Sequence, residues 1–224
     1  METGCRRRSR QVAALLLFVR FKDKIISALQ IVPFKVKDYE DSYFILGVST
    51  RREYEGQGFM KLLMNHVLDI YKDKRIYLQA YHPEIYMPFG FKESHRHILY
   101  KLDKAKYCLP SNICLSQDIS HLYDDYMRYT ANFNHYLMRD EDYFNNYLRI
   151  RCVAFNDSVL TFKNEYGQQG YMIYNDRGKF VYISEFIYNK EYLDDILKTI
   201  SVYFYKDIRI ETDCMASIHG EKTD

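Results

Sequence analysis

Two closely spaced glycines form the part of this sequence whose chemistry is easiest to state. Gly56 and Gly58 lie in the segment Glu53-Tyr54-Glu55-Gly56-Gln57-Gly58-Phe59-Met60, between an apolar run and an amphipathic stretch. Such glycines let backbone N–H groups approach an anion like a pyrophosphate closely, and a following helix N-terminus adds donors and a favourable dipole. A plain tight turn from a strand to a helix has the same pattern. The loop alone leaves both interpretations open.

A second motif lies further along the chain and contains a candidate acid. Tyr86 stands in Pro83-Glu84-Ile85-Tyr86-Met87-Pro88-Phe89-Gly90-Phe91. A tyrosine hydroxyl is neutral at pH 7 and has a proton to give, so it suits a general acid. The sequence has 23 tyrosines, so an ordinary packed aromatic is the alternative for Tyr86.

The elements around the glycine loop predict a βαβ-like unit. Residues 43–48 are continuously apolar, as in a strand buried on both faces, and the apolar residues between Met60 and Tyr71 recur at helical spacing. A strand is expected at 76–80. Upstream, the pattern predicts a β-hairpin over 15–32 with its turn at 22–24, a strand end at Pro33 and a loop over 35–41.

The second half predicts another α/β composition without a glycine-rich phosphate loop. A Pro- and Ser-containing stretch at 109–116 indicates a domain boundary. The elements expected after it are a largely helical stretch at 119–148, strands at 159–162, 170–174 and 180–188, a helix at 192–205 and a strand at 208–212.

The order of strand, glycine loop, helix and strand, followed by a tyrosine shortly before Phe-Gly-Phe, resembles the GNAT superfamily of N-acetyltransferases. The Ile-Tyr and Phe-Gly-Phe pattern resembles the Eis-like (enhanced intracellular survival) members in particular. This resemblance implies an α/β (α+β) fold, with a GNAT-like mixed sheet and flanking helices, followed by a second, degenerate GNAT-like domain. The ranges expected are an atypical segment at 1–14, the cofactor domain at 15–108, a linker at 109–117, the second domain at 118–213 and a frayed tail at 214–224.

The resemblance also implies an activity: transfer of acetyl from acetyl-CoA to a primary amine of a small molecule or a lysine, without a metal. Tyr86 would be the general acid for the departing thiolate, and Tyr81 or His82 would be a further cofactor contact. The remaining cofactor contacts implied are Leu46, Gly47, Val48, Tyr54, Glu55, Gly56, Gln57, Gly58 and Phe59.

Three departures from the family pattern keep an alternative open. Glu53 stands where the family often has Arg or Gln. The hairpin and the strand at 43–48 arrive early, without the family's opening strand and helices. Eis-like enzymes also carry a third domain whose terminal carboxylate is the base, and this sequence ends before one. The alternative is a non-catalytic GNAT-like binding or assembly module.

Composition narrows the partners. A formal net charge of +2 gives no reason to expect a nucleic-acid partner, and the apolar run 12–19 is too short to cross a bilayer. Five cysteines without zinc spacing indicate free, mostly buried thiols in a reducing compartment, so we expect a cytoplasmic location. The resemblance also points to self-association as a homo-oligomer.

Two other sets of polar residues have simple interpretations. Glu93, His95 and His97 alternate like metal ligands on one strand face, but no third ligand is evident and a solvated face is favoured. The paired acids at 124–125, 140–142 and 194–195 are expected on exposed helix faces and ends.

Overall fold

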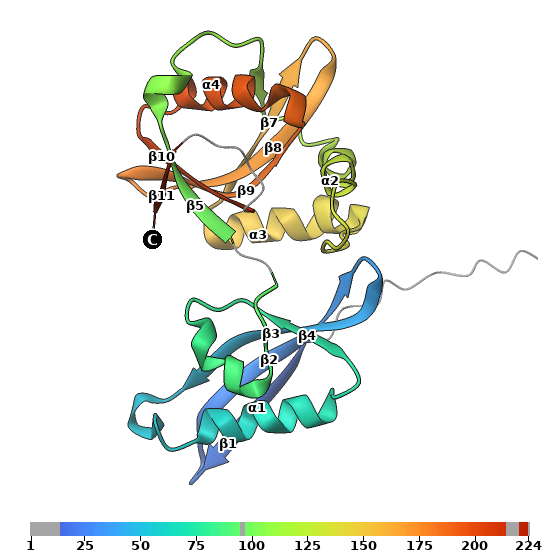
Figure 1. Ribbon diagram of the computed structural model, residues 1–224, viewed down its shortest axis with the longest axis vertical. Helices are drawn as coiled ribbons and strands as arrows, with labels where there is room; N and C mark the ends of the chain where they lie inside the picture. The colour runs from blue at the N-terminus through green and yellow to red at the C-terminus, as the bar shows by residue number, and fades with distance from the viewer. Residues whose placement is uncertain (1–13, 95–96, 214–219, 224) are drawn as a thin grey trace, which may run out of the picture. The chain divides into compact units, whose positions relative to one another are not determined.

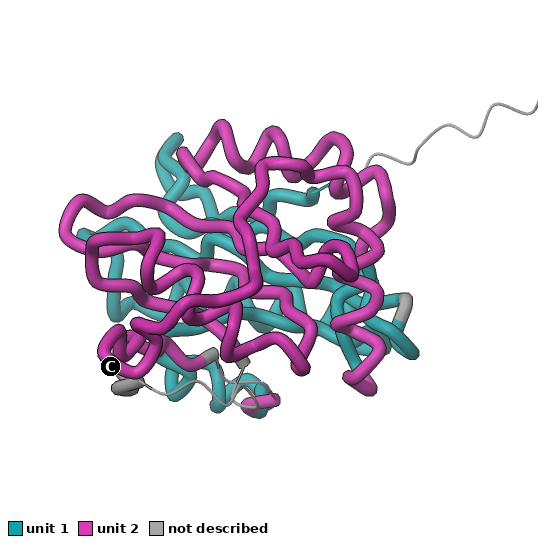
Figure 2. Tube along the Cα trace, turned by 90° about the horizontal axis from the view of Figure 1, so that it is seen from above, with its two compact units in different colours: residues 1–92, 135–138 teal, residues 93–134, 139–224 magenta. Residues whose placement is uncertain are grey.

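The computed structural model describes residues 14–94, 97–213 and 220–223, and the chain divides into two compact units. Unit 1 comprises residues 1–92 and 135–138, and unit 2 comprises residues 93–134 and 139–224 (Figure 2).

Unit 1 is a four-stranded sheet with one helix packed against it (Figure 1). The strand order is β1-β2-β3-β4, in which the first three strands are antiparallel and β4 runs parallel to β3. The elements are β1 (Leu15–Phe21), β2 (Lys24–Val36), β3 (Tyr39–Thr50), α1 (Phe59–Ile70) and β4 (Arg75–Leu78), with 3-10 turns at Arg52–Tyr54, Pro83–Ile85 and Met87–Phe89.

The core of unit 1 forms where one face of the sheet meets the apolar side of α1. Leu63, Met64 and Val67 of the helix are buried, as their spacing predicts. They pack against Leu29, Ile31 and Ile45, which lie on the same face of β2 and β3. The predicted hairpin is also confirmed, and Lys22 and Asp23 both have positive φ in its turn.

Two expectations for unit 1 are wrong. β2 continues through Pro33 to Val36, and β3 begins at Tyr39, so residues 35–41 are mostly strand rather than loop. β1 reaches only as far as Ile31 in its pairing with β2. Pro33 lies beyond the recorded β1–β2 pairs and pairs with Tyr43 of β3, so the proline does not end the strand.

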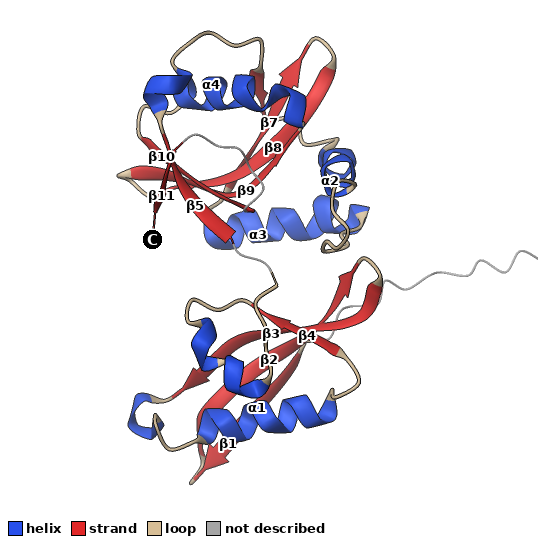
Figure 3. Ribbon diagram, viewed as in Figure 1, coloured by secondary structure: helices blue, strands red, loops and turns tan. Residues whose placement is uncertain are grey.

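Unit 2 is built on a seven-stranded sheet in the order β11-β5-β10-β9-β8-β7-β6. α4 covers one face, and α2 and α3 lie on the other (Figure 3). The elements are β5 (His97–Leu102), a 3-10 turn (Lys104–Tyr107), β6 (Cys114–Ser116), α2 (Leu122–Thr130), a π-helical turn (Tyr143–Tyr147), α3 (Leu148–Phe155), β7 (Ser158–Asn164), β8 (Gly167–Asp176), β9 (Phe180–Tyr188), a 3-10 turn (Lys190–Tyr192), α4 (Leu193–Tyr203), β10 (Asp207–Asp213) and β11 (Gly220–Thr223).

The two units repeat one order of elements. In unit 1, three antiparallel strands are followed by α1 and by β4, which is parallel to β3. In unit 2, β7, β8 and β9 are antiparallel and are followed by α4 and by β10, which is parallel to β9. Unit 2 is therefore a second domain with the same core topology, as the sequence predicted.

Several expectations for the second half need correction. The stretch 119–148 is helical only in part, because residues 131–140 form no helix. The tail was expected to fray, yet β11 pairs with β5.

Strand pairing departs at two places from the predicted domain ranges, which stay a prediction. These ranges are 15–108, 109–117 and 118–213. β5 and β6 both belong to the sheet of unit 2, where Tyr100 and Leu102 of β5 are buried in the core.

A largely buried ion pair ties together the elements of unit 2. Arg139 donates two hydrogen bonds to the carboxylate of Glu185, with Nη1 to Oε1 at 2.6 Å and Nη2 to Oε2 at 2.9 Å. Their side chains are only 13% and 12% exposed. The Tyr171 hydroxyl donates a third bond to Oε1 at 2.6 Å, and the guanidinium lies 4.6 Å from the ring centroids of Tyr126 and Tyr143.

Candidate functional site

A β-bulge interrupts the pairing of β2 with β3 at Gly47. Gln30 pairs with Leu46 and Ala28 pairs with Ser49, so one residue of β2 faces two residues of β3. Gly47 has a φ of +59°, which glycine adopts at little cost. A bulge leaves a residue out of the ladder and turns its backbone groups to a new direction. The resemblance placed cofactor contacts at Leu46, Gly47 and Val48, and the bulge lies at these residues.

β3 and β4 separate at the same point. β4 pairs with β3 only from Ser42 to Ile45. Beyond Ile45, the described strands include none beside this edge of β3. The side chain of Leu46 is 43% exposed, so the expectation of a strand buried on both faces is wrong at this end. The edge from Leu46 onward thus presents backbone donors and acceptors that an extended amide-containing ligand can pair with.

The glycine loop leads from β3 to α1. Gly56 and Gly58 have φ values of +73° and +84°, and Gly58 is the N-cap of α1. No heavy atom lies within 4 Å of the place where either glycine would carry a Cβ, so the loop is open on that side. Gly58 has no side chain to accept hydrogen bonds from the first turn of α1. The N–H groups of that turn therefore remain available to an anion.

Contacts to the β1–β2 hairpin hold this loop in place. The backbone N–H of Arg51 donates to the Ile26 carbonyl at 2.8 Å, and its Nε donates to the Ile25 carbonyl at 2.7 Å. The ring of Tyr54 lies between those of Phe21 and Phe59, with centroids 6.3 Å and 6.0 Å away. The role of Arg51 was not predicted, because a tie to a carbonyl of another strand leaves no pattern in sequence.

Tyr86 follows β4 through two 3-10 turns. Its N–H donates to the Pro83 carbonyl at 2.9 Å, and its carbonyl accepts from Phe89 at 3.0 Å. The half-buried ring makes an edge contact with Phe91, with centroids 6.2 Å apart. Tyr86 and Val48 both pack against the core of unit 1, so the structure brings the predicted acid and the bulged strand to one cluster.

A histidine and a glutamate stand just before Tyr86. His82 Nδ1 lies 3.2 Å from Glu84 Oε1, and both side chains are mostly exposed. This pair was not predicted as such. The spacing His-Pro-Glu could have indicated it, because the proline fixes the backbone between the two side chains.

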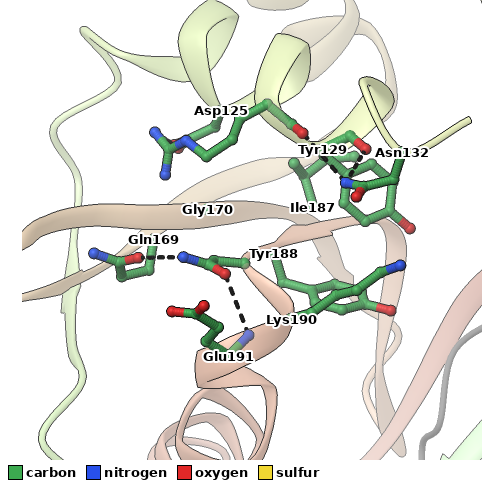
Figure 4. A pocket seen from close by; sticks show the side chains of 11 residues that line it. Asp125, Tyr129, Asn132, Gln169, Gly170, Ile187, Tyr188, Lys190 and Glu191 are labelled. Atoms are coloured by element: carbon green, nitrogen blue, oxygen red, sulfur yellow. Dashed lines mark hydrogen bonds and ion pairs between the residues drawn. The ribbon is translucent and has the colours of Figure 1, made fainter.

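In unit 2 the turn between β9 and α4 corresponds to the glycine loop of unit 1, and its backbone donors are bonded differently. A cavity of about 300 Å³ lies where α2 meets the end of β9 and the start of β8. Gln169 and Glu191 are among the residues that line the cavity (Figure 4). Asn189 begins the turn to α4 and bonds to both: its Nδ2 donates to Gln169 Oε1 at 3.0 Å and its Oδ1 accepts from the Glu191 N–H at 3.2 Å. The turn 189–192 has no glycine. Since the asparagine side chain accepts from a donor of the turn, this turn differs from the open glycine loop of unit 1. That the second domain has no cofactor loop stays a prediction.

The remaining candidates give a mixed result. Asp125 was expected on an exposed face, but its side chain is 1% exposed and bonds to Arg128 and Gln168. Burial raises the pKa of Asp125 although these partners oppose the shift. His95 lies outside the described residues. The thiols of Cys108 and Cys114 are exposed rather than buried.

The part of the chain that the structure describes contains neither a metal-ligand cluster nor a membrane-spanning helix. Across 14–94, 97–213 and 220–223, no group of three or more His, Cys, Asp and Glu side chains could hold a metal ion. Within the same ranges, none of the helices combines the length and the apolar character needed to cross a bilayer.

Residues 6–94 match the family model described as an acetyltransferase (GNAT) domain. This stretch includes the bulge, the glycine loop and Tyr86. None of the curated proteins matches the sequence.

Solved structures match both units. A probable N-acyltransferase from Enterococcus faecalis is 16% identical, with a TM-score of 0.67 over 89% of this chain and 55% of its own. A GCN5-related N-acetyltransferase from Anabaena variabilis is 14% identical, with a TM-score of 0.69 over 90% of this chain and 56% of its own. Eis1 from Mycobacterium abscessus is 12% identical, with a TM-score of 0.59 over 92% of this chain and 62% of its own.

At such identities the likeness concerns the fold. The predicted fold class, a GNAT-like α/β domain followed by a second GNAT-like domain, is confirmed. The narrower Eis-like assignment stays a prediction, since Eis1 is one of several neighbours. The chain spans less than two thirds of the length of each of these three structures.

Proposed function

We propose that the chain is an N-acetyltransferase that moves acetyl from acetyl-CoA to a primary amine of a small molecule or a lysine. The observation that carries the proposal is the coincidence of three features in residues 6–94, the stretch that matches the GNAT domain model. These are the bulge at Gly47, the open loop at Gly56 and Gly58, and Tyr86 packed on the same core.

Two backbone surfaces would hold the cofactor. The loop Tyr54–Phe59 and the first turn of α1 suit its pyrophosphate, because the loop is open at Gly56 and Gly58 and the helix dipole favours an anion. The N–H groups of Tyr54 and Glu55 donate to nearby backbone carbonyls, so the donors to phosphate would come from Gly56 onward. The free edge of β3 at Leu46–Val48 suits the amides of the pantetheine arm. When bound, acetyl-CoA supplies the activated thioester.

The chain's own part in the reaction is small. Direct attack needs the amine held in line with the thioester, a base for the ammonium proton and an acid for the departing sulfur. We assign the acid to the hydroxyl of Tyr86, whose ring is fixed by Phe91 and by the core while part of the side chain stays exposed. Cytoplasmic location remains a prediction from the cysteine content, and self-association remains a prediction from the resemblance.

Replacing Tyr86 by Phe tests the proposal. Removal of the hydroxyl should lower kcat by about 100-fold or more while the acetyl-CoA Kd changes little, because general acid catalysis typically contributes 10²–10⁴-fold. Tyr71→Phe is the matched control, since Tyr71 packs on the same core but lies at the far end of α1. Unchanged turnover in the Tyr86 variant removes this residue from the mechanism. A wild-type chain that binds the cofactor without turnover supports the non-catalytic binding module instead.

A further inference from the structure

The pair His82–Glu84 lies in the segment that joins β4 to Tyr86. The distance from Nδ1 to Oε1 is 3.2 Å, and the side chains are 73% and 66% exposed. Exposed pairs of this kind contribute little to stability, so folding gives little reason for this pair. An imidazole held by a carboxylate through one nitrogen, with the other nitrogen open, is instead the usual arrangement of a general base.

The segment begins at the point where the strands separate. The last residue of β4, Leu78, pairs with Ile45, and the bulge residues of β3 follow directly. His82 therefore stands a few residues beyond the free edge of β3.

The backbone fixes His82 relative to Tyr86. His82 is the N-cap of the turn Pro83–Ile85, its carbonyl accepts from the Ile85 N–H at 3.2 Å, and Pro83 locks φ at the first position. At the 3-10 rise of about 2 Å per residue, the two backbones lie about 8 Å apart along the turn. The amine nitrogen and the sulfur are bonded to the same carbon in the tetrahedral intermediate. A base and an acid on neighbouring turns can therefore reach the nitrogen and the sulfur, respectively.

Other titratable side chains of unit 1 fit the role less well. Asp41 pairs with Lys74 near Ser42 and Arg75, at the opposite end of the β3–β4 ladder. His66 lies on the exposed side of α1. Glu53 is engaged by Arg51 at 3.9 Å and belongs to the loop assigned to phosphate.

We propose that His82 is the general base of the acetyl transfer and that Glu84 is its positioning residue. The assignment rests on the proposed function. With the Nδ1 proton donated to Glu84, Nε2 of His82 takes one proton from the ammonium group of the acceptor. The free amine attacks the thioester carbonyl, so a C–N bond forms and the C–S bond breaks.

The protons balance in the following steps. Tyr86 gives its hydroxyl proton to the thiolate, and the second amine proton restores the tyrosine. His82 passes the first proton to water. Each acetyl transferred thus releases one proton, together with the amide and free coenzyme A.

The experiment is a pH–rate profile of the full chain between pH 5 and 9, with acetyl-CoA and a primary-amine acceptor on which the wild type is active. We compare His82→Gln, Glu84→Gln and the matched control His66→Gln. Loss of the base should lower kcat at pH 7 by about 100-fold. The residual rate should then rise with hydroxide through pH 9, because hydroxide has to replace the missing base.

Glu84 is the charged group that pairs with His82 in the described part of the chain. The other titratable side chains of residues 79–86 are Tyr81 and Tyr86. Glu84→Gln should therefore shift the acid limb of the profile with a smaller loss of kcat. The acetyl-CoA Kd and the melting temperature should stay at wild-type values in all three variants.

A His82→Gln variant with wild-type kcat and an unchanged acid limb overturns the assignment while leaving acetyl transfer and Tyr86 in place. A variant that loses cofactor affinity in proportion to its rate also overturns it, because His82 is then a binding contact. Both outcomes require an active wild type, so they are distinct from failure of the proposed function.

Discussion

Glu185→Gln should be among the most damaging single changes in unit 2. The substitution keeps the shape of the side chain and removes its charge, which leaves Arg139 as a largely buried cation without its counterion. Removing one partner of a buried pair costs about 3–5 kcal/mol, because the desolvated charge that remains has lost its compensation. The stacking of Arg139 on Tyr126 and Tyr143 recovers part of this cost. We expect a loss of about 3 kcal/mol.

Urea unfolding followed by circular dichroism measures this loss, and an exposed ion pair supplies the control. Lys206 donates two hydrogen bonds to Asp176, at 2.8 Å and 2.6 Å, but those side chains are 41% and 55% exposed. Asp176→Asn should therefore cost much less stability than Glu185→Gln. Equal losses in the two variants, or a loss below about 1 kcal/mol for Glu185→Gln, would refute the reasoning from burial.

Two further predictions follow from the same unit. Gly170→Ala should lower the free energy of unfolding by about 3 kcal/mol or more in a urea titration, because φ is +139° and the new Cβ would lie 2.1 Å from the Ile187 carbonyl oxygen. Gly178→Ala, with open space around the new Cβ, should lower it less. Burial disfavours the charged form of Glu185, but Arg139 outweighs it and holds the pKa of Glu185 below its ordinary value. The stabilisation that the Glu185 carboxylate contributes is full above its unfolded pKa of about 4.3 and is lost as the pH falls through the folded pKa. The difference in urea midpoint between wild type and Glu185→Gln should therefore narrow from pH 5 to pH 3. A constant difference would contradict this.

Local patterns predicted the elements that carry their own signals. The hairpin at 15–32 and helix α1 follow from turn residues and from apolar spacing, and β9 spans the residues expected. These features depend on residues close together in sequence.

Long-range pairing explains most of what sequence did not predict. Residues 35–41 are polar and follow a proline, yet most of them belong to β2 or β3. The two strands pair there, and each satisfies the backbone hydrogen bonds of the other. β5 pairs with β10, more than a hundred residues away, and no local pattern encodes that choice.

The candidate site likewise contains features that local motifs predicted and features that they did not. The glycine loop and Tyr86 were found from motifs, since each needs a particular residue type at a fixed spacing. The bulge at Gly47 was not predicted as a bulge, because a single glycine in an apolar run also fits a regular strand. The tie from Arg51 to Ile25 and the His82–Glu84 pair depend on side-chain geometry, which only the structure supplies.

Calorimetric titration of the purified chain with acetyl-CoA tests the central claim most directly, beside a Gly56→Asp, Gly58→Asp double variant. Gly178→Asp is the matched control, because Gly178 also has a positive φ and open space but lies in the β8–β9 turn of unit 2. We predict micromolar-range binding to the wild type and the control, and none to the double variant, whose carboxylates would repel the pyrophosphate. A folded wild type that binds no acetyl-CoA, or a double variant that binds it equally well, would contradict the assignment of this loop as the cofactor site.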